Sequence, residues 1–186
     1  NYWIKDFENI TRFISKEIEK EVDEKKLKEL IKKTVLWWEI RNTFIHHEFK
    51  ITSKGEFKTI ETNWRIWWYR IDMYQVGYEI NLLKFPGIKE EKEHTIQRNI
   101  AMFALYPNKE WLFNWFNENL LKKIERLPSF HRINRWIKTI GTPLGLTKDW
   151  YSKAWGIELA NKDFDQFKKD VKFIEENYFN IINMKE

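Results

Sequence analysis

Cysteine is absent from this sequence of 186 residues, and glycine and proline are scarce, with 6 and 4 copies. The absence of cysteine excludes disulfide bonds, thiolate nucleophiles and every zinc site that depends on cysteine ligands. The 4 histidines show neither His-x-x-x-His nor His-Glu-x-x-His spacing, so the sequence predicts no metal and no cofactor. No apolar run approaches the roughly 20 residues of a membrane-spanning helix, which predicts a cytoplasmic protein that does not enter a membrane.

Aromatic residues are abundant, and the 11 Trp, 7 Tyr and 14 Phe supply ample material for a hydrophobic core. We expect a single domain over residues 1–186, with a possible subdivision near 86–93, where Pro86-Gly87 precedes a run of charged residues. The formal net charge of +5 is compatible with a nucleic-acid partner.

Apolar residues recur at spacings of three and four along most of the chain, which predicts helices. No glycine or proline precedes Gly55, and Asp23 suits the N-cap of a helix. The predicted helices cover about 5–21, 23–47, 64–85, 89–105, 108–124, 129–140, 147–159 and 163–178. Residues 49–60 instead alternate apolar with polar around Ser53-Lys54-Gly55, as a β-hairpin does. The expected fold is therefore mainly α, a helical bundle with one small β-hairpin at about 49–60.

The C-terminal part of the predicted helix 23–47 carries the richest chemistry. Helical spacing places Arg41 on the apolar stripe, where a guanidinium is costly unless it is paired or functional. Asn42 and His46 lie four residues apart, so the amide can orient the imidazole. A guanidinium holds phosphate well, and an imidazole moves protons near neutral pH. Together these groups suit metal-independent cleavage of an RNA phosphodiester.

The string Arg41-Asn42-Thr43-Phe44-Ile45-His46-His47 resembles the signature of the HEPN superfamily, an Arg and a polar residue followed at four to six residues by His. It is most similar to the abortive-infection and antitoxin-paired branches. The resemblance implies a helical bundle, a possible homodimer and an RNase of a defence or toxin system. It also implies that Arg41 stabilises the scissile phosphate, that His46 acts as general acid or base, and that Asn42 orients both. The structural alternative is that Arg41 pairs with a carboxylate while His46 caps a helix C-terminus.

Two other segments suggest a non-enzymatic nucleic-acid-binding protein of plasmid or viral origin. Residues 137–153 have the outline of a helix-turn-helix, although Pro143 would interrupt its first helix. Residues 64–70 interleave aromatic rings with arginine, which suits single strands but equally a buried helix. The candidate nucleic-acid-binding residues of this hypothesis are Arg65, Arg70, Arg132, Arg135, Lys138, Lys148 and Lys153.

The first hypothesis is therefore a metal-independent RNA endonuclease of HEPN type with Arg41, Asn42 and His46 as catalytic residues. The alternative is a nucleic-acid-binding protein without catalysis, so whether the chain is an enzyme stays open. A third hypothesis is an interaction subunit with no chemistry of its own. RNA or DNA is the expected partner under the first two.

Overall fold

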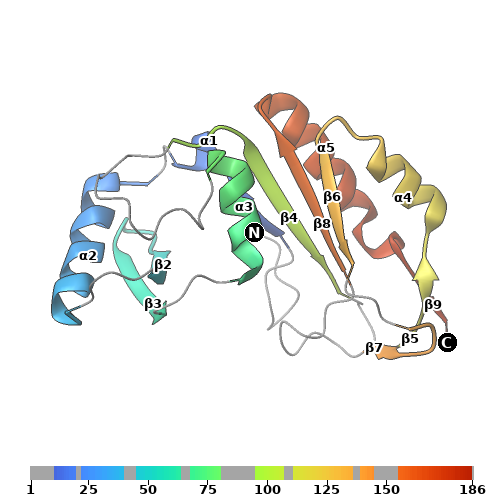
Figure 1. Ribbon diagram of the computed structural model, residues 1–186, viewed down its shortest axis with the longest axis horizontal. Coiled ribbons are helices and arrows are strands. Elements are labelled where there is room, and N and C mark those ends of the chain that lie inside the picture. Colours follow the sequence, from blue (N-terminus) through green and yellow to red (C-terminus); the bar gives the residue numbers. More distant parts are fainter. Residues whose placement is uncertain are drawn as a thin grey trace. The chain divides into compact units, whose positions relative to one another are not determined.

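The computed structural model describes residues 11–19, 22–39, 45–63, 68–80, 95–106, 111–135, 139–144 and 155–185. The chain divides into two compact units, one made of Asn1–Ile14 with Gln97–Glu186 and the other of Ser15–Ile96. Figure 1 shows the helices and strands of both units. The single domain expected from the sequence, with its subdivision near 86–93, stays a prediction.

A four-stranded antiparallel sheet forms the frame of the first unit. Its order is β1 (Thr11–Ile14), β4 (Asn99–Leu105), β8 (Trp155–Asn161) and β6 (Phe130–Arg135). Helix α5 (Phe164–Asn177) contacts β8 and β4, and α4 (Glu118–Glu125) contacts β6, so the helices cover one face (Figure 1). A second sheet has the order β7 (Pro143–Leu144), β5 (Trp111–Phe116) and β9 (Ile182–Lys185), and the 3-10 helix η3 (Tyr178–Asn180) precedes β9.

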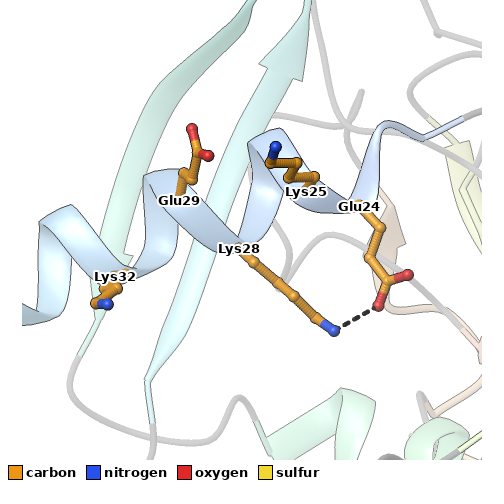
Figure 2. A pocket seen from close by; sticks show the side chains of 5 residues that line it. All are labelled: Glu24, Lys25, Lys28, Glu29 and Lys32. Atoms are coloured by element: carbon orange, nitrogen blue, oxygen red, sulfur yellow. Dashed lines mark ion pairs between the residues drawn. The ribbon is translucent and has the colours of Figure 1, made fainter.

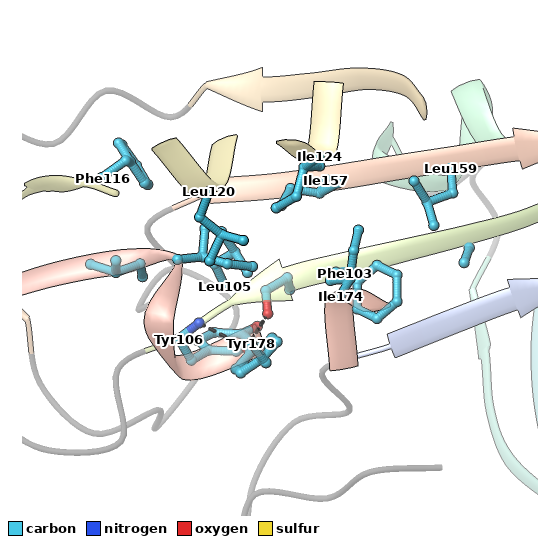
Figure 3. Packing of buried hydrophobic residues seen from close by; sticks show 14 of the residues in the cluster. Phe103, Leu105, Tyr106, Phe116, Leu120, Ile124, Ile157, Leu159, Ile174 and Tyr178 are labelled. Carbon is cyan, nitrogen blue, oxygen red and sulfur yellow. Dashed lines mark hydrogen bonds between the residues drawn. The ribbon is translucent and has the colours of Figure 1, made fainter. Parts of the chain in front are cut away.

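The hydrophobic core of this unit lies between the four-stranded sheet and the two helices. Figure 3 shows Phe103 of β4 and Ile157 and Leu159 of β8 close to Ile124 of α4 and Ile174 of α5. All five side chains have 0% exposure. Because β8 alternates its side chains between faces, Ile157 and Leu159 point to the helices and the residue between them points away.

Tyr178 ties the end of α5 to the end of β4. Its hydroxyl accepts a hydrogen bond from the Tyr106 backbone N–H at 2.9 Å and donates one to the Ala104 carbonyl (Figure 3). Burial raises the pKa of the Tyr178 phenol well above its usual value. The phenol therefore stays neutral and hydrogen-bonds two backbone groups in the buried interior.

The second unit contains a β-hairpin and separate helices. Its elements are α1 (Lys16–Glu19), α2 (Glu24–Trp37), β2 (His46–Ile51), β3 (Phe57–Asn63) and α3 (Trp68–Tyr78). The strands β2 and β3 pair antiparallel, with an irregularity between Glu48 and Phe49. Helix α2 begins after Asp23, whose carboxylate accepts the Lys26 backbone N–H at 3.1 Å, and it buries no residue.

The exposed side of α2 is strongly charged. Figure 2 shows its first three turns, where Lys28 Nζ lies 2.9 Å from Glu24 Oε1. The other side chains drawn there are Lys25, Glu29 and Lys32, all of them exposed. This is the solvated face that helical spacing predicts for residues 25–33. Such exposed pairs add little to stability, and the face is that of a water-facing helix.

The prediction of a helical bundle is wrong. Strands β4, β5, β6 and β8 occupy segments that the sequence pattern assigned to helices. Every residue of β4 is buried, and a short continuous apolar run fits a buried strand as well as a buried helix. The hairpin predicted at 49–60 is present, and the helices that begin after Asp23 and Asp163 are present too. None of the described helices is both long and apolar enough to cross a bilayer.

Candidate functional site

The face of the four-stranded sheet opposite α4 and α5 carries a buried charged residue. Glu158 lies between Ile157 and Leu159 on β8, so its side chain points away from the helix-covered core. Its cross-strand neighbour on β4 is Met102, which has 0% exposure. Glu158 itself is 1% exposed. A carboxylate at such a position requires a partner of opposite charge.

That partner is Arg132 on the other neighbouring strand, β6. The register aligns Arg132 with Glu158 directly, next to a bulge between Phe130 and Arg132. The guanidinium makes two bonds, Nε to Oε2 at 2.8 Å and Nη2 to Oε1 at 3.1 Å. The Arg132 side chain is 34% exposed, whereas that of Glu158 is 2% exposed. The pair therefore extends from the sheet interior to solvent.

The chemistry of this pair suits an anionic ligand with its metal ion. A guanidinium that holds a carboxylate in the two-pronged geometry can hold a phosphate in the same way. A carboxylate on a rigid strand is the ligand type that Mg²⁺ prefers when it is bound together with phosphates. Because the surroundings are mostly buried, these charges act on a ligand more strongly than they would in water.

A separate polar network joins Ser129, just before β6, and Asn161 of β8 to α5, on the side of the sheet away from the Arg132–Glu158 pair. Both carboxylate oxygens of Asp170 accept hydrogen bonds, one from the Ser129 N–H at 2.9 Å and one from Gln166 Nε2 at 2.9 Å. Asn161 Nδ2 donates to Ser129 Oγ at 3.0 Å, and Asn99 Nδ2 donates to the Asn161 carbonyl at 3.0 Å. These hydrogen bonds satisfy the buried Asp170 carboxylate and fix the sheet to α5.

Among the predicted catalytic residues, the structure places His46, which is the first residue of β2. The expected helical presentation is wrong, because α2 ends at Trp37 and Glu39 has the left-handed φ of 50° that follows a helix end. Arg41 and Asn42 lie outside the described residues. The catalytic assignment of Arg41, Asn42 and His46 stays a prediction, and so does the HEPN resemblance.

Among the predicted nucleic-acid-binding residues, Arg132 is the one whose side chain the structure describes, and it pairs with Glu158. Arg135 lies on β6 and Arg70 on α3. The remaining predicted positions, Arg65, Lys138, Lys148 and Lys153, lie outside the described residues. Within the proposed helix-turn-helix, Pro143–Leu144 form strand β7 and pair with Trp111 and Leu112 of β5.

Glu158 is the residue that sequence reasoning missed. The segment 147–159 was expected to be a helix, on which a glutamate is an ordinary surface residue. The available signal was a lone carboxylate inside the run Trp155-Gly156-Ile157-Glu158-Leu159-Ala160. If that run forms a buried strand, an unpaired glutamate inside it would be strongly destabilising. The glutamate would therefore need a partner of opposite charge or a ligand.

No family model matches this sequence, and no curated protein matches it. The fold is similar to that of L-amino acid ligase from Bacillus licheniformis, with a TM-score of 0.74 and 12% identity over 96% of this chain and 44% of that one. Phosphoribosylglycinamide synthetase from Anaerococcus prevotii gives a TM-score of 0.66 and 12% identity over 95% of this chain and 45% of that one. N5-carboxyaminoimidazole ribonucleotide synthetase from Thermotoga maritima gives a TM-score of 0.58 and 11% identity over 92% of this chain and 43% of that one.

These similarities correct the functional predictions. The neighbours have an ATP-grasp type of α+β fold, not a helical bundle, and they are ligases and synthetases. The HEPN-type RNase and the alternative nucleic-acid-binding protein are both contradicted by this likeness. The expected partners and the homodimer stay predictions. The chain spans less than half the length of each of these three neighbours. Its fold is similar to the folds of these three enzymes over almost all of its own length.

Proposed function

We propose that this chain is the ATP-binding part of an ATP-dependent ligase. The observation that carries the proposal is the fold, which follows that of L-amino acid ligase over 96% of the chain at a TM-score of 0.74. Two synthetases share it over 95% and 92% of the chain. A fold alone does not define a function, so the proposal needs a site whose chemistry fits.

The Arg132–Glu158 pair is the part of the described residues that fits MgATP. Arg132 supplies a planar cation with several donors, which neutralises phosphate oxygens and orients them. Glu158 supplies carboxylate oxygens on a central strand, and such oxygens hold Mg²⁺ together with phosphates. When bound, Mg²⁺ would neutralise charge on the phosphates during cleavage of ATP.

The position of the pair supports the same assignment. Both side chains project from paired strands, which hold binding groups more rigidly than loops do. The bulge beside Arg132 is also a device that re-aims side chains near binding sites.

Thermal unfolding of the full chain with increasing MgATP tests this proposal. A ligand that binds the folded state alone stabilises it, by about 2.7 kcal/mol at 100 times its Kd. We expect the Tm of the wild type to rise with MgATP. Glu158→Gln keeps the size of the side chain but removes its charge, and we expect it to lose most of that rise.

Matched variants separate binding from folding. Glu125→Gln changes an exposed glutamate on α4, and we expect its Tm to rise as the wild type does. Arg132→Lys keeps the charge but loses the two-pronged geometry, and we expect a reduced rise. If Glu158→Gln folds and responds fully to MgATP, Glu158 does not hold the nucleotide. If the wild type shows no rise at millimolar MgATP, the proposed function is refuted.

A further inference from the structure

A second group of ligand-type side chains lies on the hairpin of the other unit. His46 and Glu48 are two residues apart on β2, so both side chains project from the same face. Glu61 on β3 is the direct cross-strand partner of Glu48. One ligand atom from each of the three side chains lies within 4.8 Å of the others. The backbone register of the hairpin therefore brings together one imidazole and two carboxylates.

The arrangement places two carboxylates opposite each other on paired strands. Like charges directly opposite one another on paired strands destabilise a sheet, and Glu48 and Glu61 occupy such positions. His46 lies beside them, with Nε2 at 3.4 Å from Glu48 Oε1. A positive charge between the two carboxylates would turn their repulsion into attraction.

The burial of the group decreases from the histidine outward. His46 is 7% exposed, the Glu48 side chain is 28% exposed, and Glu61 is exposed. The imidazole is thus fixed by its surroundings, while the solvent side of the group stays accessible. Three protein ligands with one open side are also the arrangement of zinc sites that keep a position for water.

One distance within the group agrees with the ligand spacing around a small transition-metal ion, and the remaining ligand atoms lie within 4.8 Å of one another. Zinc ligands at about 2.0–2.2 Å from a tetrahedral ion lie roughly 3.4 Å from one another. The separation of His46 Nε2 and Glu48 Oε1 is 3.4 Å. Asn63 Nδ2 donates to Glu61 Oε1 at 2.8 Å, which orients this carboxylate as outer hydrogen bonds do at metal sites.

We propose that His46, Glu48 and Glu61 form a binding site for one divalent transition-metal ion, Zn²⁺ or Mn²⁺. One nitrogen with two carboxylate oxygens suits both ions. The spacing that creates the site is His-x-Glu on one strand with a second glutamate across the turn. A search for helical histidine spacing cannot detect it. The site lies within one hairpin and does not depend on the proposed ATP binding.

The neighbouring histidine provides a matched control. His47 projects from the opposite face of β2, and both of its ring nitrogens contact threonine hydroxyls, Nε2 with Thr59 Oγ1 at 3.2 Å and Nδ1 with Thr62 Oγ1 at 2.8 Å. Glu56 in the turn of the hairpin is an exposed glutamate outside the group. His47→Gln and Glu56→Gln therefore replace one histidine and one glutamate outside the group, as controls for His46→Gln and Glu61→Gln within it.

Calorimetric titration of the untagged, chelator-treated full chain with ZnCl₂, and separately with MnCl₂, tests the proposal without any nucleotide. We expect one equivalent to bind, and we expect His46→Gln and Glu61→Gln to weaken binding at least about tenfold. His47→Gln and Glu56→Gln should bind as the wild type does. Circular dichroism of each variant checks that the hairpin unit still folds.

Two results would overturn the proposal. One is a wild type that binds neither ion at millimolar concentration, in which case His46 serves only as an ion-pair partner of Glu48. The other is binding that persists unchanged in folded His46→Gln and Glu61→Gln, which would place the ion elsewhere on the chain. Because the metal ion alone is the probe, either result leaves the ATP proposal untouched.

Discussion

Replacing Arg132 by leucine removes the partner of a buried carboxylate, that of Glu158. Glu158 is 1% exposed, and its two oxygens are held at 2.8 and 3.1 Å by Arg132. Removing one member of a buried pair costs about 3–5 kcal/mol, because the remaining charge is desolvated without compensation. The Arg132 side chain is 34% exposed, so water can partly replace it, and we expect a loss of about 3 kcal/mol.

Replacing Glu158 in place of Arg132 is expected to cost less stability. Glu158→Leu leaves a guanidinium that can turn toward solvent, and we expect a loss of about 1 kcal/mol. Replacing both residues by leucine removes the desolvated charge altogether, so the double variant should lie within about 1 kcal/mol of the wild type. The coupling energy of the cycle is then about 4 kcal/mol in magnitude.

Urea unfolding followed by circular dichroism measures all four free energies. A loss larger in Arg132→Leu than in the double variant supports the account. An Arg132→Leu variant as stable as the wild type would refute the reasoning, since it would mean that Glu158 does not need this partner.

Three further predictions concern the frame of the site. Ile174→Ala leaves a cavity at a side chain with 0% exposure and should cost about 3 kcal/mol in urea unfolding, whereas the exposed Lys169→Ala should cost little. Asp163→Ala removes the side chain that accepts two backbone N–H groups at 2.9 and 3.1 Å, and thermal unfolding should show a loss of about 1 kcal/mol. Burial raises the pKa of Tyr178 in the folded chain above 10, the pKa of an unfolded tyrosine. Above pH 10 the unfolded chain therefore loses a proton that the folded chain keeps, and the free energy of unfolding falls as the pH rises. Tyr178→Phe should make that alkaline decline shallower in urea unfolding between pH 9 and pH 11, and an unchanged slope would contradict the assignment.

Local signals in the sequence predicted some elements well. Asp23, predicted as an N-cap, precedes a described helix, because a side chain that accepts early backbone N–H groups marks a helix start. The helix predicted at 163–178 is present as α5. The alternation around Gly55 likewise predicted the hairpin, where Gly55 has a φ of 72° that a turn requires. These features depend on neighbouring residues alone.

The four-stranded sheet could not be predicted in the same way. Strand β4 is apolar on both faces, so it lacks the alternation that identifies a half-buried strand. The Arg132–Glu158 pair arises from the register of β6 and β8, which joins residues 26 positions apart. If both segments are interpreted as helices, no strand register aligns Arg132 with Glu158. Nothing then distinguishes Glu158 from an ordinary surface glutamate.

The central claim is that the chain binds ATP with Mg²⁺, and isothermal titration of the full wild-type chain with MgATP tests it most directly. We expect binding to a single site with a Kd of about 1 mM or tighter, which corresponds to about −4 kcal/mol or a more favourable free energy. The heat should disappear in Glu158→Gln and remain in Glu125→Gln. A wild type that releases no binding heat at millimolar MgATP would contradict the account.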